Sequence, residues 1–453
     1  MRKFAVVAFM VVQMGFGICL AETKEAAVDE KANTFYIQAV MYENAGEYSK
    51  AEEAYKNALK YAPSSASIRS ALASVYAKTG KDTAAIAELK RAISDDPGYI
   101  QARKQLGDIY IEKAMYKEAV LQYEQILEHD TDSSETNFTL AYLYTRIDKD
   151  TEAIEFYRKA IDEGHDPAIS YYNLGYALTK KEMFEQAIEA YEKSVSLSPD
   201  WFEPHFNLGI MYFGTGNIEK AIPMLEKAKK LNPQSLLTYT HLADSYQRMK
   251  NLDKTIENLK EAIRLEPNEF ALKLILSVAY TNAGKNTEAL ESCRKAYEMA
   301  PEEASVNFQM GAIHYQAGNN TEAIKFFEKT IELDPEHPRA LNTLSYAYAE
   351  KGINLDEALK MIRKAIESQP DNGSFLDTLG WVYFKKGMFN EAIKTLKEAL
   401  KFLKDDPVVY DHLGDVYLEK GLKKEALKHW ETALKFNPND KKVKEKMEKV
   451  KNK

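Results

Sequence analysis

The stretch YNLGYALTKKEMFEQAIEAYEKSVSLSP, residues 172–199, contains the pattern that decides the fold of this chain. Its second part places Phe184, Ala187, Ile188 and Tyr191 three and four residues apart, which puts them on one face of a helix. A shorter helical pattern precedes this helix, and Pro199 ends it. We therefore expect two helices joined by a short turn. A single pair of this kind cannot bury its own apolar face, so it requires neighbours of the same kind.

The pattern recurs along almost the whole chain. A small residue of the second helix returns every 34 residues, except for one interval of 35 between Ala323 and Ala358. The recurring residues are Ala51, Ala85, Ala119, Ala153, Ala187, Ala221, Thr255, Ala289, Ala323, Ala358, Ala392 and Ala426. Counted from Ala32, the frame runs through twelve units to Asp440, which predicts a repeat protein.

Other repeat positions distinguish residues that the fold requires from residues that are candidates for binding. Position 8 holds a small residue in every unit, such as Gly380, which lets paired helices approach closely, and position 11 is tyrosine in ten units. Glycine ends the first helix in most units, as at Gly387, because it adopts the left-handed conformation at little cost. Trp381 occupies position 9, where other units have residues as different as Ser74 and Asp108. We therefore interpret Trp381 as a clue to binding.

The stretch 172–199 resembles the tetratricopeptide repeat (TPR) family, and the resemblance covers residues 32–440. It implies an all-α fold, a right-handed superhelical solenoid of twelve helix-turn-helix repeats whose first helices line a concave groove. We expect repeats 1–6 at residues 32–235 and repeats 7–12 at residues 236–440. Residues 441–453 are expected to form a polar capping helix, or alternatively a basic tail that binds an anionic partner.

The N-terminal residues have the layout of a secretory signal. Arg2 and Lys3 precede an apolar run that ends in small residues, which predicts a signal peptide at residues 1–21, cleaved after Ala21, and a short linker at residues 22–31. Two alternatives stay open, a lipid on Cys19 and an uncleaved membrane anchor. We expect an exported protein, periplasmic or associated with the bacterial outer membrane.

Composition and motifs argue against several classes of function. Asp and Glu outnumber Lys and Arg by 69 to 61, a net charge of −8, which argues against a nucleic-acid partner. The chain has no GxxxxGK[ST], HExxH, CxxC or GxSxG motif, and its eight histidines are scattered. We therefore predict no enzyme, no cofactor and no metal site. Cys293 is predicted to be a buried, apolar cysteine.

A stripe of first-helix residues at repeat positions 2, 5, 9 and 12 is the candidate groove, because these positions share one helix face. Aromatic residues gather on it in repeats 4–6 and 9–11, and aromatic side chains dominate binding hot spots. These residues are Phe138, Tyr142, Tyr172, Tyr176, Phe206, Phe213, Phe308, Tyr315, Tyr346, Trp381 and Phe384. We predict that they bind a protein or peptide. The alternative, that neighbouring helices bury these rings against one another, stays open.

An acidic row, Asp377, Asp411, Asp415 and Glu419, runs beside the second aromatic group. Such a row would steer a basic or lysine-bearing partner toward the groove. A solvated acidic face is the alternative.

These observations predict an exported, non-catalytic scaffold that binds proteins or peptides in a concave groove. Similar exported repeat proteins assist envelope assembly, which implies a partner in an envelope complex, with membrane association through that partner or a lipid anchor. Three alternatives stay open. The rings could stack on a carbohydrate or cell-wall polymer, the chain could be an accessory subunit of a polysaccharide or secretion apparatus, or it could be an unrecognised enzyme.

Overall fold

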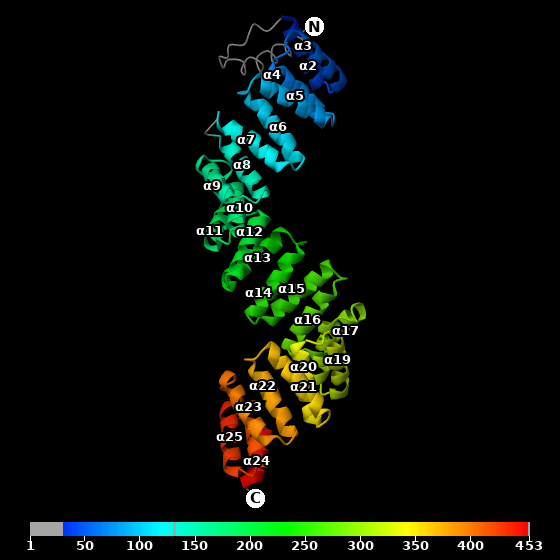
Figure 1. The fold of residues 1–453 in the computed structure, drawn as a ribbon, viewed down its shortest axis with the longest axis vertical. Helices are drawn as coiled ribbons and strands as arrows, with labels where there is room; N and C mark the ends of the chain where they lie inside the picture. The colour runs from blue at the N-terminus through cyan, green and yellow to red at the C-terminus, as the bar shows by residue number, and fades with distance from the viewer. Residues whose placement is uncertain (1–29, 130–132, 452–453) are drawn as a thin grey trace. The chain divides into compact units, whose positions relative to one another are not determined.

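A computed structural model of the chain describes residues 30–129 and 133–451, which form 25 α-helices and no strand (Figure 1). The predicted signal peptide at residues 1–21 and most of the predicted linker lie outside the described residues. The all-α repeat architecture expected from the sequence is confirmed.

The chain divides into two compact units, an N-terminal unit that ends at Gly216 and a C-terminal unit that begins at Asn217. The N-terminal unit contains α2 (Glu30–Asn44), α3 (Tyr48–Tyr61), α4 (Ala66–Lys78), α5 (Asp82–Asp95), α6 (Ile100–Glu112), α7 (Tyr116–Leu127), α8 (Ser134–Arg146), α9 (Asp150–Asp162), α10 (Pro167–Lys180), α11 (Phe184–Leu197) and α12 (Phe202–Gly214). The boundary lies between the two helices of the sixth repeat. The boundary therefore lies one helix before the division between repeats 6 and 7, at residues 235 and 236, that the sequence predicts.

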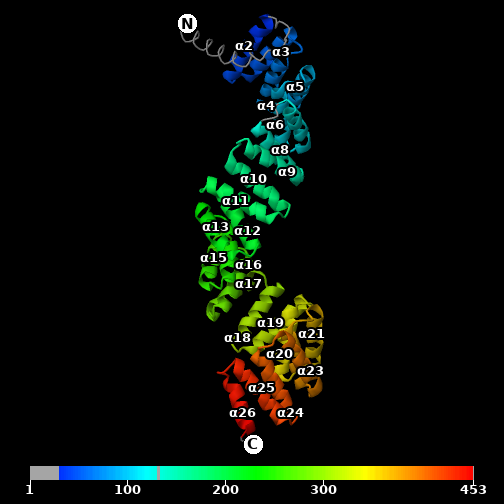
Figure 2. The same ribbon diagram turned by 90° about the vertical axis from the view of Figure 1, so that its left-hand side faces the viewer.

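The C-terminal unit contains α13 (Ile218–Leu231), α14 (Leu236–Arg248), α15 (Leu252–Leu265), α16 (Phe270–Asn282), α17 (Asn286–Met299), α18 (Ala304–Gln316), α19 (Asn320–Leu333), α20 (Pro338–Lys351), α21 (Leu355–Ser368), α22 (Gly373–Lys385), α23 (Phe389–Phe402), α24 (Pro407–Glu419), α25 (Lys423–Phe436) and α26 (Lys441–Lys451). Within each unit, successive helices pack against each other along the chain (Figure 2). The even-numbered helices α14 to α24 are the first helices of their repeats, and α26 follows the last repeat.

The turn between the two helices of a repeat requires a left-handed residue. Gly387 ends α22 with φ 75°, as the sequence predicts. Where a repeat lacks this glycine, the backbone still adopts the conformation, as at Ala114 with φ 54°. The repeat therefore requires the left-handed backbone conformation at this turn, and glycine is the residue that adopts it with the least strain.

The small residue at repeat position 8 allows the two helices of a repeat to touch. A Cβ atom added to Gly380 would lie 2.6 Å from Cγ of Leu396 on α23, and one added to Gly175 would lie 2.8 Å from the Tyr191 ring on α11. Both distances are shorter than a van der Waals contact. The architectural role predicted for Gly380 is therefore a close approach to Leu396, which is itself fully buried.

The tyrosine at position 11 joins neighbouring repeats. In four repeats its hydroxyl donates a hydrogen bond to a glutamate 20 residues earlier, on the second helix of the preceding repeat. The pairs are Tyr144–Glu124, Tyr212–Glu192, Tyr246–Glu226 and Tyr348–Glu328. Burial, together with the glutamate, raises the pKa of Tyr212, Tyr246 and Tyr348 to about 12. These hydroxyls therefore keep their protons at neutral pH and act as donors, a role that phenylalanine could not fill.

Candidate functional site

The aromatic residues of repeats 4–6 lie on α8, α10 and α12 of the N-terminal unit and differ in exposure. We call Phe138, Tyr142, Tyr172, Tyr176, Phe206 and Phe213 the N-terminal aromatic surface. Tyr176 is 47% exposed, and Ile169, about two turns earlier on the same face of α10, is 39% exposed. The other five rings are half-buried. This surface therefore combines embedded rings with accessible apolar side chains.

Packing explains the embedded rings of this surface. The ring of Phe138 stacks on His165 with centroids 4.4 Å apart. Tyr172 lies 4.8 Å from the ring of Trp201, and its hydroxyl accepts a hydrogen bond of 3.3 Å from Asn207 Nδ2. Phe138 and Tyr172 therefore contribute to the structure of their repeats, whereas the exposed ring of Tyr176 is not needed to fill the core.

The aromatic residues of repeats 9–11 are more deeply buried. We call Phe308, Tyr315, Tyr346, Trp381 and Phe384 the C-terminal aromatic cluster. Phe308 is 8% exposed and Trp381 6%, and both belong to one hydrophobic core that includes helices α18 to α22. The remaining three rings are half-buried and pack against that core.

The contacts of Trp381 show why its ring is buried. Its Nε1 donates a hydrogen bond of 2.6 Å to Glu350 Oε1 at the end of α20. The indole stacks on the His412 ring of α24 at 4.1 Å and lies 4.8 Å from the Phe384 ring. Trp381 thus joins three successive first helices. The variability of position 9 in the sequence does not mean that this ring is free, because its partners come from the neighbouring repeats.

The acidic row is largely paired inside the protein. Asp377 Oδ1 lies 2.9 Å from His412 Nδ1, and both side chains are almost completely buried. Lys446 Nζ on α26 lies 2.8 Å from Asp411 and 2.7 Å from Asp415. Of the four predicted residues, only Glu419 is exposed. The negative charge that would steer a basic partner is therefore mostly compensated, because α26 covers this part of α24 with a lysine.

These contacts determine the pKa values of the two bases that pair with the acidic row, His412 and Lys446. Burial alone would lower the pKa of His412, but Asp377, through its charge and hydrogen bond, and the nearby Asp411 and Asp415 raise it above the usual value. Burial likewise opposes the charge of Lys446, yet its two carboxylate partners raise the pKa of the ammonium. Both bases are held in their charged forms by the carboxylates.

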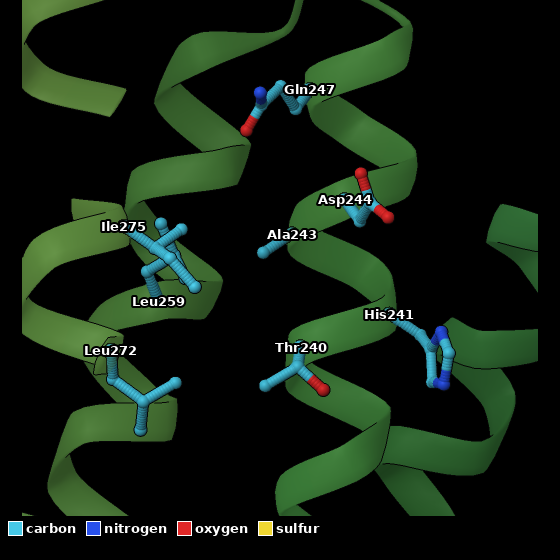
Figure 3. A pocket seen from close by; sticks show the side chains of 8 residues that line it. All are labelled: Thr240, His241, Ala243, Asp244, Gln247, Leu259, Leu272 and Ile275. Carbon is cyan, nitrogen blue, oxygen red and sulfur yellow. The ribbon is translucent and has the colours of Figure 1, made fainter. Parts of the chain in front are cut away.

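Two pockets lie between first helices of the C-terminal unit. The first, of about 430 Å³, separates α14 from α16 over α15 (Figure 3). Thr240, Asp244 and Gln247 form its polar wall on α14, and Leu259, Leu272 and Ile275 form the apolar wall opposite. The second, of about 350 Å³, is lined by Phe308, Arg339, Asn342, Thr343, Gln369, Asn372, Ser374 and Phe375.

No catalytic or metal-binding arrangement stands out in the part of the chain that the structure describes. No group of three or more His, Cys, Asp or Glu residues within it could hold a metal ion. Burial raises the pKa of the Cys293 thiol to about 12, so this fully buried cysteine stays protonated. None of the helices in residues 30–129 and 133–451 has the length and apolar character needed to cross a bilayer.

The pairings of the acidic row were missed by sequence reasoning, although a signal was present. In four places a residue at position 5 of a repeat forms a hydrogen bond with the residue 35 positions later, at position 6 of the next repeat or of α26. The hydrogen-bonded pairs are Ser70–Gln105, Tyr172–Asn207, Asp377–His412 and Asp411–Lys446. Complementary residues at this spacing could therefore have been recognised before the structure was known.

The structure and these contacts define the class of the protein, an all-α helical repeat protein. TPR family models match at residues 38–100, 83–135, 134–163, 168–200, 202–235, 241–304, 282–345, 314–380, 380–421 and 407–440. The chain belongs to the tetratricopeptide repeat family, whose members are generally non-catalytic scaffolds of protein–protein interaction. Among curated proteins, none matches the sequence.

Solved structures share the repeat but diverge in sequence. The APC/C hetero-tetramer Cut9-Hcn1 is 14% identical over 95% of this chain and 97% of its own, with a TM-score of 0.48. The C-terminal part of a TPR protein from Cytophaga hutchinsonii is 17% identical over 53% and 98%, with a TM-score of 0.47. YrrB, described as a TPR protein with an unusual peptide-binding site, is 24% identical over 42% and 97%, with a TM-score of 0.34. At these TM-scores we transfer no site from these proteins to this chain.

Proposed function

We propose that this protein is an exported, non-catalytic scaffold that binds a protein or peptide partner on its N-terminal aromatic surface, in an assembly of the bacterial envelope. The observation that carries the proposal is the exposure of Tyr176 and Ile169 on α10, beside half-buried rings of α8 and α12. Accessible apolar side chains grouped on one face mark interaction sites. Tyrosine is particularly suited to this role, because its rigid ring supplies a large contact area and its hydroxyl a hydrogen bond.

The N-terminal aromatic surface supports the proposal better than the C-terminal aromatic cluster. Trp381 and Phe308 are almost completely buried in the core, whereas the outer part of Tyr176 is accessible. Arg146, on α8, adds a cation near this surface. Its hydrogen bond to the Tyr116 hydroxyl raises the pKa of the guanidinium, and the nearby Tyr142 and Tyr176 add to this effect. A partner with an apolar segment would thus find aromatic contacts and one guanidinium donor.

Replacing Tyr176 by alanine should weaken binding of such a partner about tenfold or more, the usual cost of truncating an aromatic hot spot. Peptides enriched from a random display library on the full chain would serve as ligands, and fluorescence anisotropy would give their Kd. Phe184→Ala is the matched control, because this ring is 38% exposed in the same repeat but lies on the second helix. Equal affinities of Tyr176→Ala and the native protein would contradict the proposed surface. Binding of isolated cell-wall glycan, with no peptide enriched, would favour the carbohydrate alternative.

Export makes a separate prediction about the N-terminus. Expression in a Gram-negative bacterium should give a periplasmic protein whose mass corresponds to a chain starting at Glu22, because the signal layout ends at Ala21. Intact-mass spectrometry distinguishes this product from one that starts at a lipid-modified Cys19 and from the uncleaved chain. A full-length product in the cytoplasmic fraction would contradict export.

A further inference from the structure

The second pocket of the C-terminal unit contains an arginine that has no carboxylate partner. Arg339, in the first turn of α20, forms no ion pair with any of the described residues, and its side chain is exposed. Its guanidinium carbon lies 4.8 Å above the ring of Phe308, whose own position is set by the core. A guanidinium held on an aromatic face is less hydrated and better oriented than a free one. Arg339 is therefore prepared to bind an anion.

An unsatisfied acceptor lies one turn further along the same helix. Asn342 Oδ1 is buried and accepts no hydrogen bond in the described structure. Buried polar atoms without partners are uncommon, and one that lines a pocket points to a missing donor. Residues three apart share a helix face, so Arg339 and Asn342 present their polar groups to the same pocket.

Asn342 also lacks a contact that residues at its repeat position form in four other places. It occupies position 5, which pairs with position 6 of the next repeat in the four hydrogen-bonded pairs described above. The tenth repeat has one additional residue, and the corresponding residue of the next repeat, Thr378, is buried without a hydrogen bond to Asn342. The intramolecular partner found elsewhere is therefore absent here.

Two other polar side chains of the pocket are already engaged. Asn372 Oδ1 accepts from the main-chain nitrogens of Ser374 and Phe375, and its Nδ2 donates to Gln369 Oε1. Thr343 Oγ1 donates to the main-chain oxygen of Arg339. The guanidinium of Arg339 and the amide of Asn342 are available to a ligand in this pocket, which the apolar side chains of Phe308 and Phe375 also line.

We propose that this pocket binds an acidic residue of a peptide partner. The carboxylate of that residue binds Arg339, and a main-chain N–H of the peptide close to it donates a hydrogen bond to Asn342 Oδ1. This inference rests on the proposed function, since it assumes a peptide ligand. A guanidinium recognises a carboxylate through two parallel hydrogen bonds, and the peptide N–H supplies the donor that Asn342 lacks. An inorganic anion would satisfy Arg339 only. The net charge of −8 does not prevent local binding, because at physiological salt charges further away than about 8 Å are largely screened.

The carboxylate can come from an Asp or Glu side chain or from the C-terminus of the partner. Two random-peptide libraries separate these sources, one with free C-termini and one with the peptide inside a loop. Both would be selected on the full native chain and on the Arg339→Ala variant. We expect Asp or Glu to be enriched at one position of the loop library, or a free carboxylate to be required, on the native chain only.

Affinities of the enriched peptides then test each contact. Changing the acidic residue to its amide, or Arg339→Ala, should weaken binding about tenfold, and Arg339→Lys should restore only part of it because lysine lacks the planar fork. N-methylation of the peptide bond at the acidic residue should weaken binding to the native chain but not to Asn342→Leu. Arg294→Ala, on the second helix α17 and 66% exposed in its side chain, is the matched control and should bind normally.

Each result decides between the two proposals. If enriched peptides depend on Tyr176 but carry no carboxylate preference, and bind Arg339→Ala as well as the native chain, the acidic-residue pocket is wrong and the scaffold function stands. If no peptide is enriched on the native chain, the proposed function fails and this inference fails with it.

Discussion

Trp381→Ala should lower the free energy of unfolding of the C-terminal unit by about 3–5 kcal/mol, as is usual when a large buried aromatic residue is removed. The indole is 6% exposed and stacks on His412, and its Nε1 bonds Glu350. Truncation would leave a cavity between three first helices and a buried imidazole without its aromatic neighbour. Because stability in a repeat protein is a sum of local terms, the loss should be concentrated in α20 to α24.

Hydrogen exchange measured by mass spectrometry would locate this loss, and urea unfolding would give its size. Tyr176→Ala is a control of similar chemistry at an exposed position, where substitutions usually change stability by about 0.5 kcal/mol or less. If Trp381→Ala left stability and hydrogen exchange unchanged but abolished peptide binding, Trp381 would be a binding residue, as the sequence predicts. Reduced binding along with local unfolding would instead reflect damage to the fold.

Asp377→Ala should also cost about 3–5 kcal/mol, because it leaves the buried His412 without the carboxylate that compensates its charge. His412 is 4% exposed, and the Trp381 ring covers one face of it. Asp411 and Asp415 contribute further negative charge but are shared with Lys446. The direct partner of the imidazole is therefore Asp377, and Asp377→Asn, which retains a hydrogen-bonding side chain, should cost less than the alanine variant.

The same pair gives stability a dependence on pH whose sign follows from the His412 pKa. The folded protein raises this pKa above the value of about 6.5 expected in the unfolded chain. The stabilisation is therefore complete below about pH 6.5 and is lost as the pH rises through the folded-state pKa. Urea unfolding between pH 5.5 and 9 should show this decline in the native protein and a flatter profile in Asp377→Ala. A steeper decline in the variant would contradict the assignment to His412.

Much of the fold could be predicted because its main structural requirements recur from repeat to repeat. The close contact with the second helix requires a small residue at position 8, as at Gly380. The turn after the first helix requires a residue in the left-handed conformation. In four repeats the tyrosine at position 11 donates a hydrogen bond to a glutamate 20 residues earlier. Twelve copies of the same pattern made these positions visible without any knowledge of the structure.

The candidate site was harder to predict, because exposure depends on side chains from other repeats. The same stripe of positions yields an accessible ring at Tyr176 and a buried one at Trp381. The difference arises from the partners of Trp381 on α20 and α24, which the sequence does not place next to it without a structure. The choice between a binding ring and a packing ring therefore could not be made from repeat position alone.

The sequence by itself determined the helix pairs, their number and their packing positions, since these depend on local helix periodicity and on one neighbour that is always the same. Only the tertiary structure decided which charges remain available. Lys446 and His412 compensate Asp411, Asp415 and Asp377, whereas Arg339 keeps no carboxylate partner within the described residues. The physical reason is that a charge is compensated by whatever lies within a few ångströms in space, and in this protein those groups are separated by about one repeat along the chain.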